Sequence, residues 1–327
     1  MTAKQPKKPT QDRRPPAVIV AGPTASGKSA LALDLAEALD GTVINADALQ
    51  LYRDLRVLSA RPDAADESRA PHRLYGVLEA RQAASAGLWR GLALEQMAEA
   101  RAQGRLPILC GGSGLYIKAL VEGLAPVPTV PIAVREAAAE ELTRLGNAAF
   151  HAALTERDPE MGARLRASDP QRMLRAWSVL EATGRSLAAW QALPSGDPAP
   201  YRFMIVVLMP PREALRTRCD ERFEMMLAHG ALEEVDALLA RNLPANLPVM
   251  KAIGVRELGA YLGGALSLSD ATTQAQAATR RYAKRQATWL RTQVGLEGEG
   301  RLLLTEQYSE SHTQKIFTKI RESLLTE

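Results

Sequence analysis

The chain has 327 residues, of which 46% are hydrophobic and 24% are charged, proportions typical of a globular protein with two or three domains. No apolar run approaches the roughly 20 residues that a membrane-spanning helix needs, which excludes a transmembrane transporter or receptor. The first sixteen residues carry the whole net charge of +4, so net charge is no argument for nucleic-acid binding by the remainder.

The N-terminal segment 1–16 is polar and basic and lacks the apolar stretch of a secretory signal. Its Lys, Pro and Gln content predicts a disordered tail. The two cysteines, Cys110 and Cys219, do not form a disulfide framework, and each is expected to be a small core residue. We therefore expect a cytoplasmic protein without a membrane partner, and a monomer.

The first predicted strand, 17–21, leads into a glycine-rich loop and then a helical pattern with Leu31, Leu35 and Leu39 on one face. This order is the context in which G-x-x-x-x-G-K-[ST] binds phosphates, through inward-turned backbone N–H groups and a helix N-terminus. Lys28 would reach the outer phosphates, and the Ser29 hydroxyl can hold Mg²⁺. The predicted phosphate-binding residues are Gly22, Pro23, Thr24, Ala25, Ser26, Gly27, Lys28 and Ser29.

A second apolar strand, 42–46, ends at Asp47. The carboxyl ends of parallel strands line the ligand crevice of an open sheet, so Asp47 is expected to face the same crevice as the glycine loop. Asp47 could instead simply cap a helix. After an amphipathic helix at 87–103, the strand 106–110 ends in Gly111, Gly112 and Ser113, a second feature of the crevice.

No apolar strand after the glycine loop ends in the aspartate that helps ordinary P-loop ATPases to hold Mg²⁺. Strand 106–110 ends in glycines, and strand 203–209 ends in Pro210 and Pro211. Asp47 is the one strand-end carboxylate. The phosphate loop therefore need not imply ATP hydrolysis, and it could hold a diphosphate that leaves.

Proline-rich breaks bracket residues 126–199, a segment whose pattern is helical throughout and predicts a helical insertion in an α/β domain. Within it, Asp169 and Pro170 start a helix whose first turns carry Gln171, Arg172 and Arg175. These side chains either form a solvated face or hold a nucleic-acid backbone.

Downstream, helices are predicted around 212–229 and 231–241, and a basic helix at 279–291. The sequence has no acid between Asp270 and Glu297. Arg281 and Arg285 stack on one face of this helix, which makes it the best predicted nucleic-acid footprint of the chain. A solvated face that pairs with acids elsewhere is the alternative.

Seven segments together resemble the bacterial tRNA dimethylallyltransferases (tRNA isopentenyltransferases): residues 22–29, 47–52, 71–74, 111–116, 169–172, 253–257 and 281–289. They keep the family's order and cover roughly residues 17–295. The resemblance implies transfer of a dimethylallyl group from its diphosphate to N6 of adenine 37, beside the anticodon, in tRNAs that read codons beginning with U. It implies Mg²⁺ as cofactor and the tRNA anticodon stem-loop and dimethylallyl diphosphate as partners.

The resemblance also assigns site residues. Asp47 would be the catalytic base, with Lys28 and Ser113 as further catalytic residues, and Arg222 would assist diphosphate binding. Ala48 stands where the family often has Ser. Residues expected to contact tRNA are Asp47, Ala48, Leu49, Gln50, Ser113, Arg135, Gln171, Arg172, Met173, Leu174, Arg175, Lys251, Ala252, Ile253, Gly254, Val255 and Arg256, besides Arg281 and Arg285.

The predicted fold class is α/β: a P-loop NTPase-like core with a parallel sheet flanked by helices, plus an all-helical insertion domain. The core is assigned to 17–125 and 200–300, with tRNA-binding helices at its C-terminal end, the insertion domain to 126–199 and a C-terminal extension to 301–327. Two further enzyme classes stay open. An adenylate isopentenyltransferase would act on free nucleotide, and a P-loop small-molecule kinase would share the glycine loop.

Overall fold

The computed structural model describes residues 13–294, 300–306, 308 and 313–325, and the chain divides into two compact units. The larger unit contains the chain up to Val121 and from Ala199 onward, and the smaller unit is residues 122–198. Most of the predicted disordered tail, residues 1–12, lies outside the described residues. None of the helices built from described residues combines the length and apolarity that crossing a bilayer requires.

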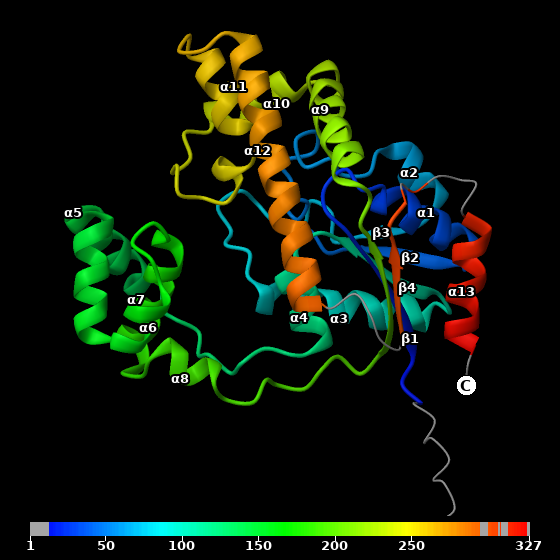
Figure 1. The fold of residues 1–327 in the computed structure, drawn as a ribbon, viewed down its shortest axis with the longest axis horizontal. Coiled ribbons are helices and arrows are strands. Elements are labelled where there is room, and N and C mark those ends of the chain that lie inside the picture. Colours follow the sequence, from blue (N-terminus) through cyan, green and yellow to red (C-terminus); the bar gives the residue numbers. More distant parts are fainter. Residues whose placement is uncertain (1–12, 295–299, 307, 309–312, 326–327) are drawn as a thin grey trace, which may run out of the picture. The chain divides into compact units, whose positions relative to one another are not determined.

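The larger unit is built on a six-stranded parallel sheet with strand order β3-β2-β4-β1-β5-β6 (Figure 1). The strands are β1 (Pro16–Ala21), β2 (Gly41–Asn45), β3 (His72–Arg73), β4 (Leu106–Gly111), β5 (Arg202–Leu208) and β6 (Arg301–Leu304). β1 lies at the centre, where Val20 pairs with Cys110 of β4 and Ile19 pairs with Ile205 of β5. This arrangement confirms the predicted α/β class with a parallel sheet.

Both faces of the sheet are buried, as expected for parallel strands with near-continuous apolar sequences. One face packs Val18, Val20 and Ile108 against Leu31 and Leu35 of α1 (Lys28–Ala38). The other face packs Ile19, Ile44 and Leu109 against helices α3 (Ala86–Ala102) and α4 (Gly114–Val121). The glycine loop at the carboxyl end of β1 is therefore held by a rigid, doubly covered sheet.

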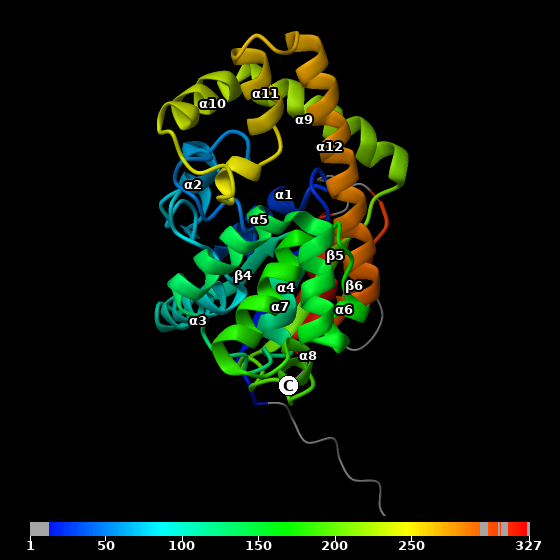
Figure 2. The same cartoon turned by 90° about the vertical axis from the view of Figure 1, so that its left-hand side faces the viewer.

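Four helices of the larger unit form a group beyond the carboxyl ends of the strands (Figure 2). They are α9 (Arg212–Ala228), α10 (Ala231–Ala240), α11 (Val255–Leu262) and α12 (Leu268–Trp289), with short helices η1 (Val249–Lys251) before α11 and η2 (Leu290–Val294) after α12. A further short helix of the larger unit, α2 (Ala64–Arg69), follows β2 in the chain and begins with a capping box formed by Asp63 and Asp66.

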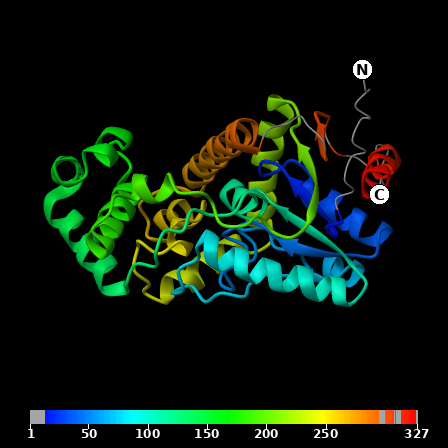
Figure 3. The same ribbon diagram turned by 90° about the horizontal axis from the view of Figure 1, so that it is seen from below.

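Residues assigned to a C-terminal extension join the core of the larger unit. β6 pairs in parallel with β5, and α13 (Thr313–Leu325) places Ile316 and Ile320 in the apolar layer that contains α1. Figure 3 shows α13 beside α1. The Tyr308 hydroxyl donates a hydrogen bond of 2.5 Å to the Asp34 carboxylate of α1. This segment therefore completes the sheet and covers one of its faces.

The smaller unit consists of α5 (Ile132–Arg157), α6 (Pro159–Arg164), α7 (Pro170–Thr183) and α8 (Leu187–Gln191), without a strand. Its own core contains Phe150, Leu154 and Val179. The Phe150 and Trp177 rings lie 4.7 Å apart between centroids, which joins α5 to α7. Gly146, at a φ of 73°, interrupts α5 and bends it.

Candidate active site

The glycine loop wraps the start of α1 as its sequence predicts. Gly27 has a φ of 90° and Ala25 a φ of 64°, left-handed conformations that turn successive backbone N–H groups toward one side of the loop. Gly22 approaches its neighbours so closely that an added Cβ would lie 2.5 Å from the Ser26 hydroxyl oxygen. α1 begins at Lys28, so the first N–H groups of this helix have no intrahelical partner and are available to an anion.

Two cations converge beside this loop. Lys28 and Arg222 line a cavity of about 190 Å³ together with Gly27, Ser29 and Arg218. Burial lowers the pKa of the Lys28 ammonium, and the charge of Arg222 lowers it further, while Cys110 and Asp47 act in the opposite direction. Burial likewise lowers the pKa of Arg222. Neither cation forms an ion pair with a residue that the structure describes, and two partly buried positive charges held side by side indicate a site for a multiply charged anion.

Asp47 lies just beyond the carboxyl end of β2 and is held by the backbone around it. The buried Asn45 side chain accepts a hydrogen bond from the Asp47 N–H at 2.7 Å and donates to the Asp47 carbonyl oxygen at 3.0 Å. The Trp89 indole N–H fixes Asn45 in turn, through its carbonyl oxygen at 2.8 Å. Asn45 therefore holds the Asp47 backbone through two hydrogen bonds, and Trp89 anchors Asn45.

The Asp47 carboxylate keeps one oxygen available. Its Oδ1 accepts a hydrogen bond from the Leu49 N–H at 3.0 Å. Its Oδ2 accepts none from any residue that the structure describes, and Asp47 forms no ion pair there. The carboxylate is half-buried and acts electrostatically on both Lys28 and Arg222, which places it in the crevice of the glycine loop. A partly buried carboxylate with one unoccupied oxygen has the geometry of a proton acceptor.

The end of β4 lies against Asp47 as the crevice argument predicts. The Ser113 hydroxyl accepts a hydrogen bond from the Ala48 N–H at 3.0 Å, and the Ser113 N–H donates to the Ala46 carbonyl oxygen at 3.2 Å. Gly111 approaches Ala46 so closely that a Cβ would lie 2.1 Å from its carbonyl oxygen. Ser113 therefore supports the segment that carries Asp47.

Gln50, in the same segment, uses its amide group internally. Its Nε2 donates to the carbonyl oxygens of Ser59 at 3.0 Å and Ala60 at 2.8 Å. The Gln50 Oε1 accepts no hydrogen bond from the described residues and remains available. Gln50 can therefore offer a hydrogen-bond acceptor, but not a donor, to a nucleobase.

Gln286 of α12 is a site residue that sequence reasoning missed. Its side chain is 6% exposed, and both ends of its amide are used. Oε1 accepts a hydrogen bond from the Thr24 N–H at 2.9 Å, and Nε2 donates to the Gly112 carbonyl oxygen at 3.1 Å. This one side chain joins the glycine loop to the end of β4. The sequence signal for this role would have been a polar residue on the apolar face of α12, beside Ala283 and Ala287.

The predicted segment 251–256 lies at the η1–α11 turn of the larger unit. Lys251 and Arg256 are exposed, and Ile253 is half-buried. Gly254 has a φ of 100° and starts α11, with its N–H donating to the Glu257 carboxylate at 3.0 Å. The two exposed cations bracket this turn.

In the smaller unit, Arg135, Gln171, Arg172 and Arg175 are exposed, and Leu174 is half-buried. Arg135 of α5 lies close enough to Arg175 of α7 that its charge, after the larger effect of burial, lowers the Arg175 pKa. The helices α5 and α7 therefore place two cations together on this unit. Arg172 pairs with Asp169 at 3.3 Å.

Three residues of the predicted tRNA-contact set have side chains inside apolar cores. Met173 is fully buried in the core of the smaller unit, and Ala252 and Val255 are buried in that of the larger unit. Successive residues of a helix or turn point to different faces, so a continuous motif includes positions that pack inward. The side chains of these three residues contribute to the cores of their units, and the expected tRNA contact at these positions stays a prediction.

Arg281 and Arg285 are both exposed on α12, and the Arg285 guanidinium lies 5.6 Å from the centre of the Tyr282 ring. Trp289 is half-buried and packs against the core of the larger unit. The ring of Trp289 covers Gly114, where a Cβ would lie 1.9 Å from the indole. α12 thus presents a basic outer side and an apolar inner side.

Residues 50–293 match the sequence model of the IPP transferase family. The tRNA dimethylallyltransferase of Rhodospirillum rubrum is 53% identical over 312 residues, covering 95% of this chain and 96% of that protein. The tRNA dimethylallyltransferase of Parvibaculum lavamentivorans is 49% identical over 310 residues, covering 95% of this chain and 97% of that protein.

Solved structures agree with these sequence matches. The full-length tRNA isopentenylpyrophosphate transferase of Bacillus halodurans superposes with a TM-score of 0.68 at 27% identity, over 95% of this chain and 97% of that one. A eukaryotic dimethylallyltransferase, crystallised acting on tRNA, superposes with a TM-score of 0.76 at 21% identity, over 94% of this chain and 77% of that one. The latter likeness concerns the fold.

Proposed function

This chain belongs to the IPP transferase family, and from that premise we propose that it transfers a dimethylallyl group from dimethylallyl diphosphate to N6 of adenine 37 in tRNAs that read codons beginning with U. One observation supports the proposal above all. A carboxylate with an unoccupied oxygen, Asp47, shares a crevice with the anion site of Lys28 and Arg222.

The reaction is a substitution at an allylic carbon. The N6 lone pair of adenine forms a bond to the first carbon of the dimethylallyl group, the carbon–oxygen bond to the diphosphate breaks, and the bonding electrons leave with the diphosphate. The amine then carries an extra proton, which Asp47 accepts through Oδ2. Lys28, Arg222 and the N–H groups of the glycine loop stabilise the charge on the leaving diphosphate.

The residues around the loop fit a bound Mg²⁺ that the diphosphate itself carries. Mg²⁺ takes oxygen ligands and usually keeps several waters, needing one or two groups from the protein. The Ser29 hydroxyl borders the Lys28 cavity and is exposed, so it would hold the ion there. Among the described residues, no cluster of three metal-binding side chains offers another site. When bound, Mg²⁺ supplies further positive charge to the diphosphate.

Adenine 37 lies in a stacked anticodon loop, and its N6 must reach Asp47 inside the crevice. The base therefore has to leave the stack and enter the protein, as in other enzymes that modify nucleobases. Ala48, Leu49, Gln50 and Ser113 surround Asp47 and would contact the base. The exposed cations Lys251 and Arg256, and Arg135, Arg172 and Arg175 of the smaller unit, would hold the phosphate backbone.

A transfer assay with radiolabelled dimethylallyl diphosphate tests the proposal. The acceptors are an unmodified anticodon stem-loop with adenine 37, the same stem-loop with guanine at that position, AMP and ATP. We expect label on the adenine stem-loop alone. Label on AMP instead would assign the protein to the enzymes acting on free nucleotides. ATP hydrolysis without any labelled product would identify a P-loop kinase or ATPase.

A further inference from the structure

Tyr282 of α12 has a titratable side chain that the proposed reaction does not use. It is half-buried, and its hydroxyl makes no hydrogen bond with any residue that the structure describes. The hydroxyl oxygen is not enclosed within the protein and reaches solvent. The hydroxyl of a buried tyrosine usually finds a partner inside the protein. One that lacks such a partner is therefore available to a ligand.

Tyr282 lies on the face of α12 that covers the glycine loop and the end of β4. Gln286, one turn further along the helix, bonds to both of these segments. Trp289, a turn beyond Gln286, covers Gly114. Residues four and seven positions apart share one face of a helix, so Tyr282 lies on this face too. It is therefore placed beside the crevice between the loop and the strand end.

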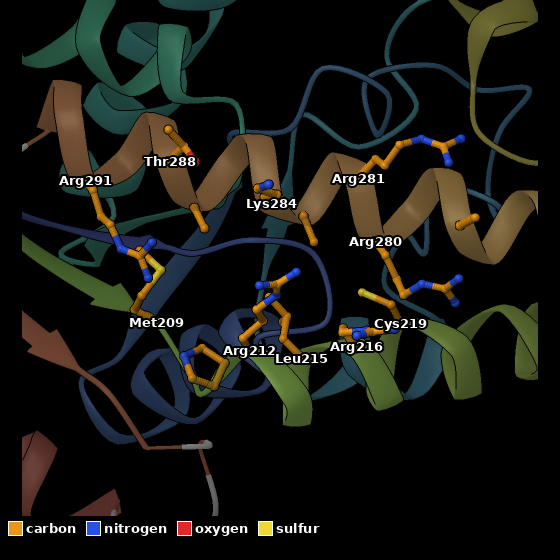
Figure 4. Close-up of a pocket in the computed structure, with 14 residues that line it drawn as sticks. Met209, Arg212, Leu215, Arg216, Cys219, Arg280, Arg281, Lys284, Thr288 and Arg291 are labelled. Atoms are coloured by element: carbon orange, nitrogen blue, oxygen red, sulfur yellow. The ribbon is translucent and has the colours of Figure 1, made fainter.

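A different side of α12 faces α9. Figure 4 shows side chains of both helices extending over the groove between them, and Arg280 and Lys284 are among those from α12. Tyr282 does not line this groove, and it does not line the cavity of Lys28 and Arg222 either. The Tyr282 hydroxyl therefore belongs to neither of these two clusters of basic side chains.

The charged groups that act on the Tyr282 phenol are those of Asp47 and Arg285. Burial raises the pKa of this phenol most, the negative charge of Asp47 raises it further, and the Arg285 guanidinium acts in the opposite direction. The same guanidinium, 5.6 Å from the centre of the ring, stabilises the position of the ring. Because the pKa is raised, the hydroxyl keeps its proton at neutral pH. Tyr282 is therefore a hydrogen-bond donor on the Asp47 side of the crevice.

Asp47 and Tyr282 border one crevice without bonding to each other. The Asp47 Oδ1 accepts from the Leu49 N–H, and neither carboxylate oxygen bonds to the Tyr282 hydroxyl. The crevice thus offers an acceptor, the Asp47 Oδ2, and a donor, the Tyr282 hydroxyl. Adenine matches this pair at the edge that carries N6, because the N6 amine donates and the ring nitrogens on either side of it, N1 and N7, accept.

We propose that the Tyr282 hydroxyl donates a hydrogen bond to a ring nitrogen beside N6 of the acceptor adenine, N1 or N7, and so orients the base while Asp47 takes the proton from N6. This inference rests on the proposed function, since it takes adenine 37 as the acceptor. A site built to hydrogen-bond a substrate atom rejects analogues that lack this atom. Tyr282 is thereby a specificity-determining residue for the acceptor base.

The test compares single-turnover transfer rates at subsaturating stem-loop. Tyr282→Phe removes the hydroxyl and keeps the ring, while stem-loops with 1-deazaadenine or 7-deazaadenine at position 37 each lack one ring nitrogen. We expect one of these two analogues to lower the wild-type rate about tenfold or more, because it leaves the hydroxyl without its acceptor. In Tyr282→Phe the penalty of that analogue should be smaller by about fivefold or more, since its intrinsic effect on N6 is common to both proteins.

The matched control is Tyr261→Phe, which removes the hydroxyl of a half-buried tyrosine on α11. Its analogue penalties should equal those of wild type. Equal penalties for both analogues in wild type and Tyr282→Phe would overturn the inference, even if Tyr282→Phe is slower with adenine. A weakened Kd for inorganic diphosphate in Tyr282→Phe, together with unchanged analogue penalties, would assign the hydroxyl to the donor side and overturn it as well.

The same measurements separate this inference from the proposed function. A wild-type protein that labels no adenine stem-loop would refute the proposed transfer and, with it, the contact of Tyr282 to the base. Transfer by the wild type, with analogue penalties that stay the same in Tyr282→Phe, would retain the transfer and refute the contact alone.

Discussion

The Gln286 side chain accepts a hydrogen bond from the Thr24 N–H at 2.9 Å, joining the basic helix α12 to the phosphate loop. The two residues are 262 positions apart in the chain. The other end of the same amide holds the Gly112 carbonyl oxygen, beside the Ser113 contact to the Asp47 segment. A single buried amide thus fixes the glycine loop, the proposed diphosphate site, relative to the strand end that supports Asp47, the proposed proton acceptor.

Replacing Gln286 tests this connection. Gln286→Ala leaves the Thr24 N–H and the Gly112 carbonyl without their partner, which destabilises the ordered loop by about 1–3 kcal/mol. We expect the Kd for inorganic diphosphate to weaken about tenfold or more. Gln286→Glu keeps the acceptor but cannot donate to Gly112, and it adds a negative charge beside the anion site, so it should be at least as severe.

The matched control is Gln276→Ala, a glutamine of the same helix whose amide bonds to α9 rather than to the loop. It should leave the diphosphate Kd within about twofold of wild type. Equal effects of Gln276→Ala and Gln286→Ala would reduce Gln286 to a general stabiliser of α12.

The lowered pKa of Lys28 predicts a pH dependence of anion binding. Burial disfavours the charged ammonium, so in the free protein Lys28 loses its proton at a lower pH than an ordinary lysine. As pH rises through that lowered pKa, the cation is lost and the diphosphate Kd should increase by up to about tenfold per pH unit. Titration calorimetry across the alkaline range measures it.

Lys28→Arg is the control for the pH prediction, because a guanidinium keeps its charge over the same range. Its diphosphate Kd should vary little with pH, whatever its absolute value. A wild-type Kd that is flat up to the ordinary lysine range would contradict the account of Lys28.

Ser113 is predicted to act by positioning. Ser113→Ala removes the acceptor of the Ala48 N–H and loosens the segment that holds Asp47. Loss of a hydrogen bond worth about 0.5–1.5 kcal/mol should lower the single-turnover rate by roughly two- to tenfold, with diphosphate affinity unchanged. Ser113→Thr keeps the hydroxyl and should restore the rate. A rate in Ser113→Thr as low as that in Ser113→Ala would argue against this role.

Glu234 of α10 holds the segment that follows Gln50. Its carboxylate accepts hydrogen bonds from three successive N–H groups, those of Arg56 at 2.6 Å, Val57 at 2.7 Å and Leu58 at 2.9 Å. Glu234→Ala should lower the free energy of unfolding by about 2 kcal/mol, because hydrogen bonds to a charged group are among the stronger ones. Its exposed neighbour serves as control: Glu233→Ala should change stability by less than about 0.5 kcal/mol in the same denaturant titration.

Local patterns predicted the parts of the fold whose signals are local. The apolar run before Gly22 and the leucines of α1 define a strand, loop and helix without reference to the rest of the chain, and the structure has them. β6 was missed because Arg301–Leu304 is a four-residue strand whose pairing with β5 spans about a hundred residues of sequence. No local periodicity marks so short a strand.

The residues of the candidate site likewise divide into those that local sequence patterns place and those that only tertiary packing places. Asp47 and Ser113 could be placed in one crevice because parallel strands end at a common edge. Gln286 could not be placed, since its partners are set by the packing of α12 on the loop. Ala252 and Val255 stay predicted tRNA contacts, but their side chains pack into the core, which a motif treated as one continuous segment does not show. Tertiary packing decides both cases.

The most direct test of the account is the single-turnover transfer rate of Asp47→Asn with saturating stem-loop and dimethylallyl diphosphate. Asparagine keeps the Oδ1 acceptor for the Leu49 N–H but cannot take a proton at the other position. The account predicts a fall of about 10²- to 10⁴-fold, with the Kd of both substrates within about threefold of wild type. A rate within about threefold of wild type would show that Asp47 is not the proton acceptor.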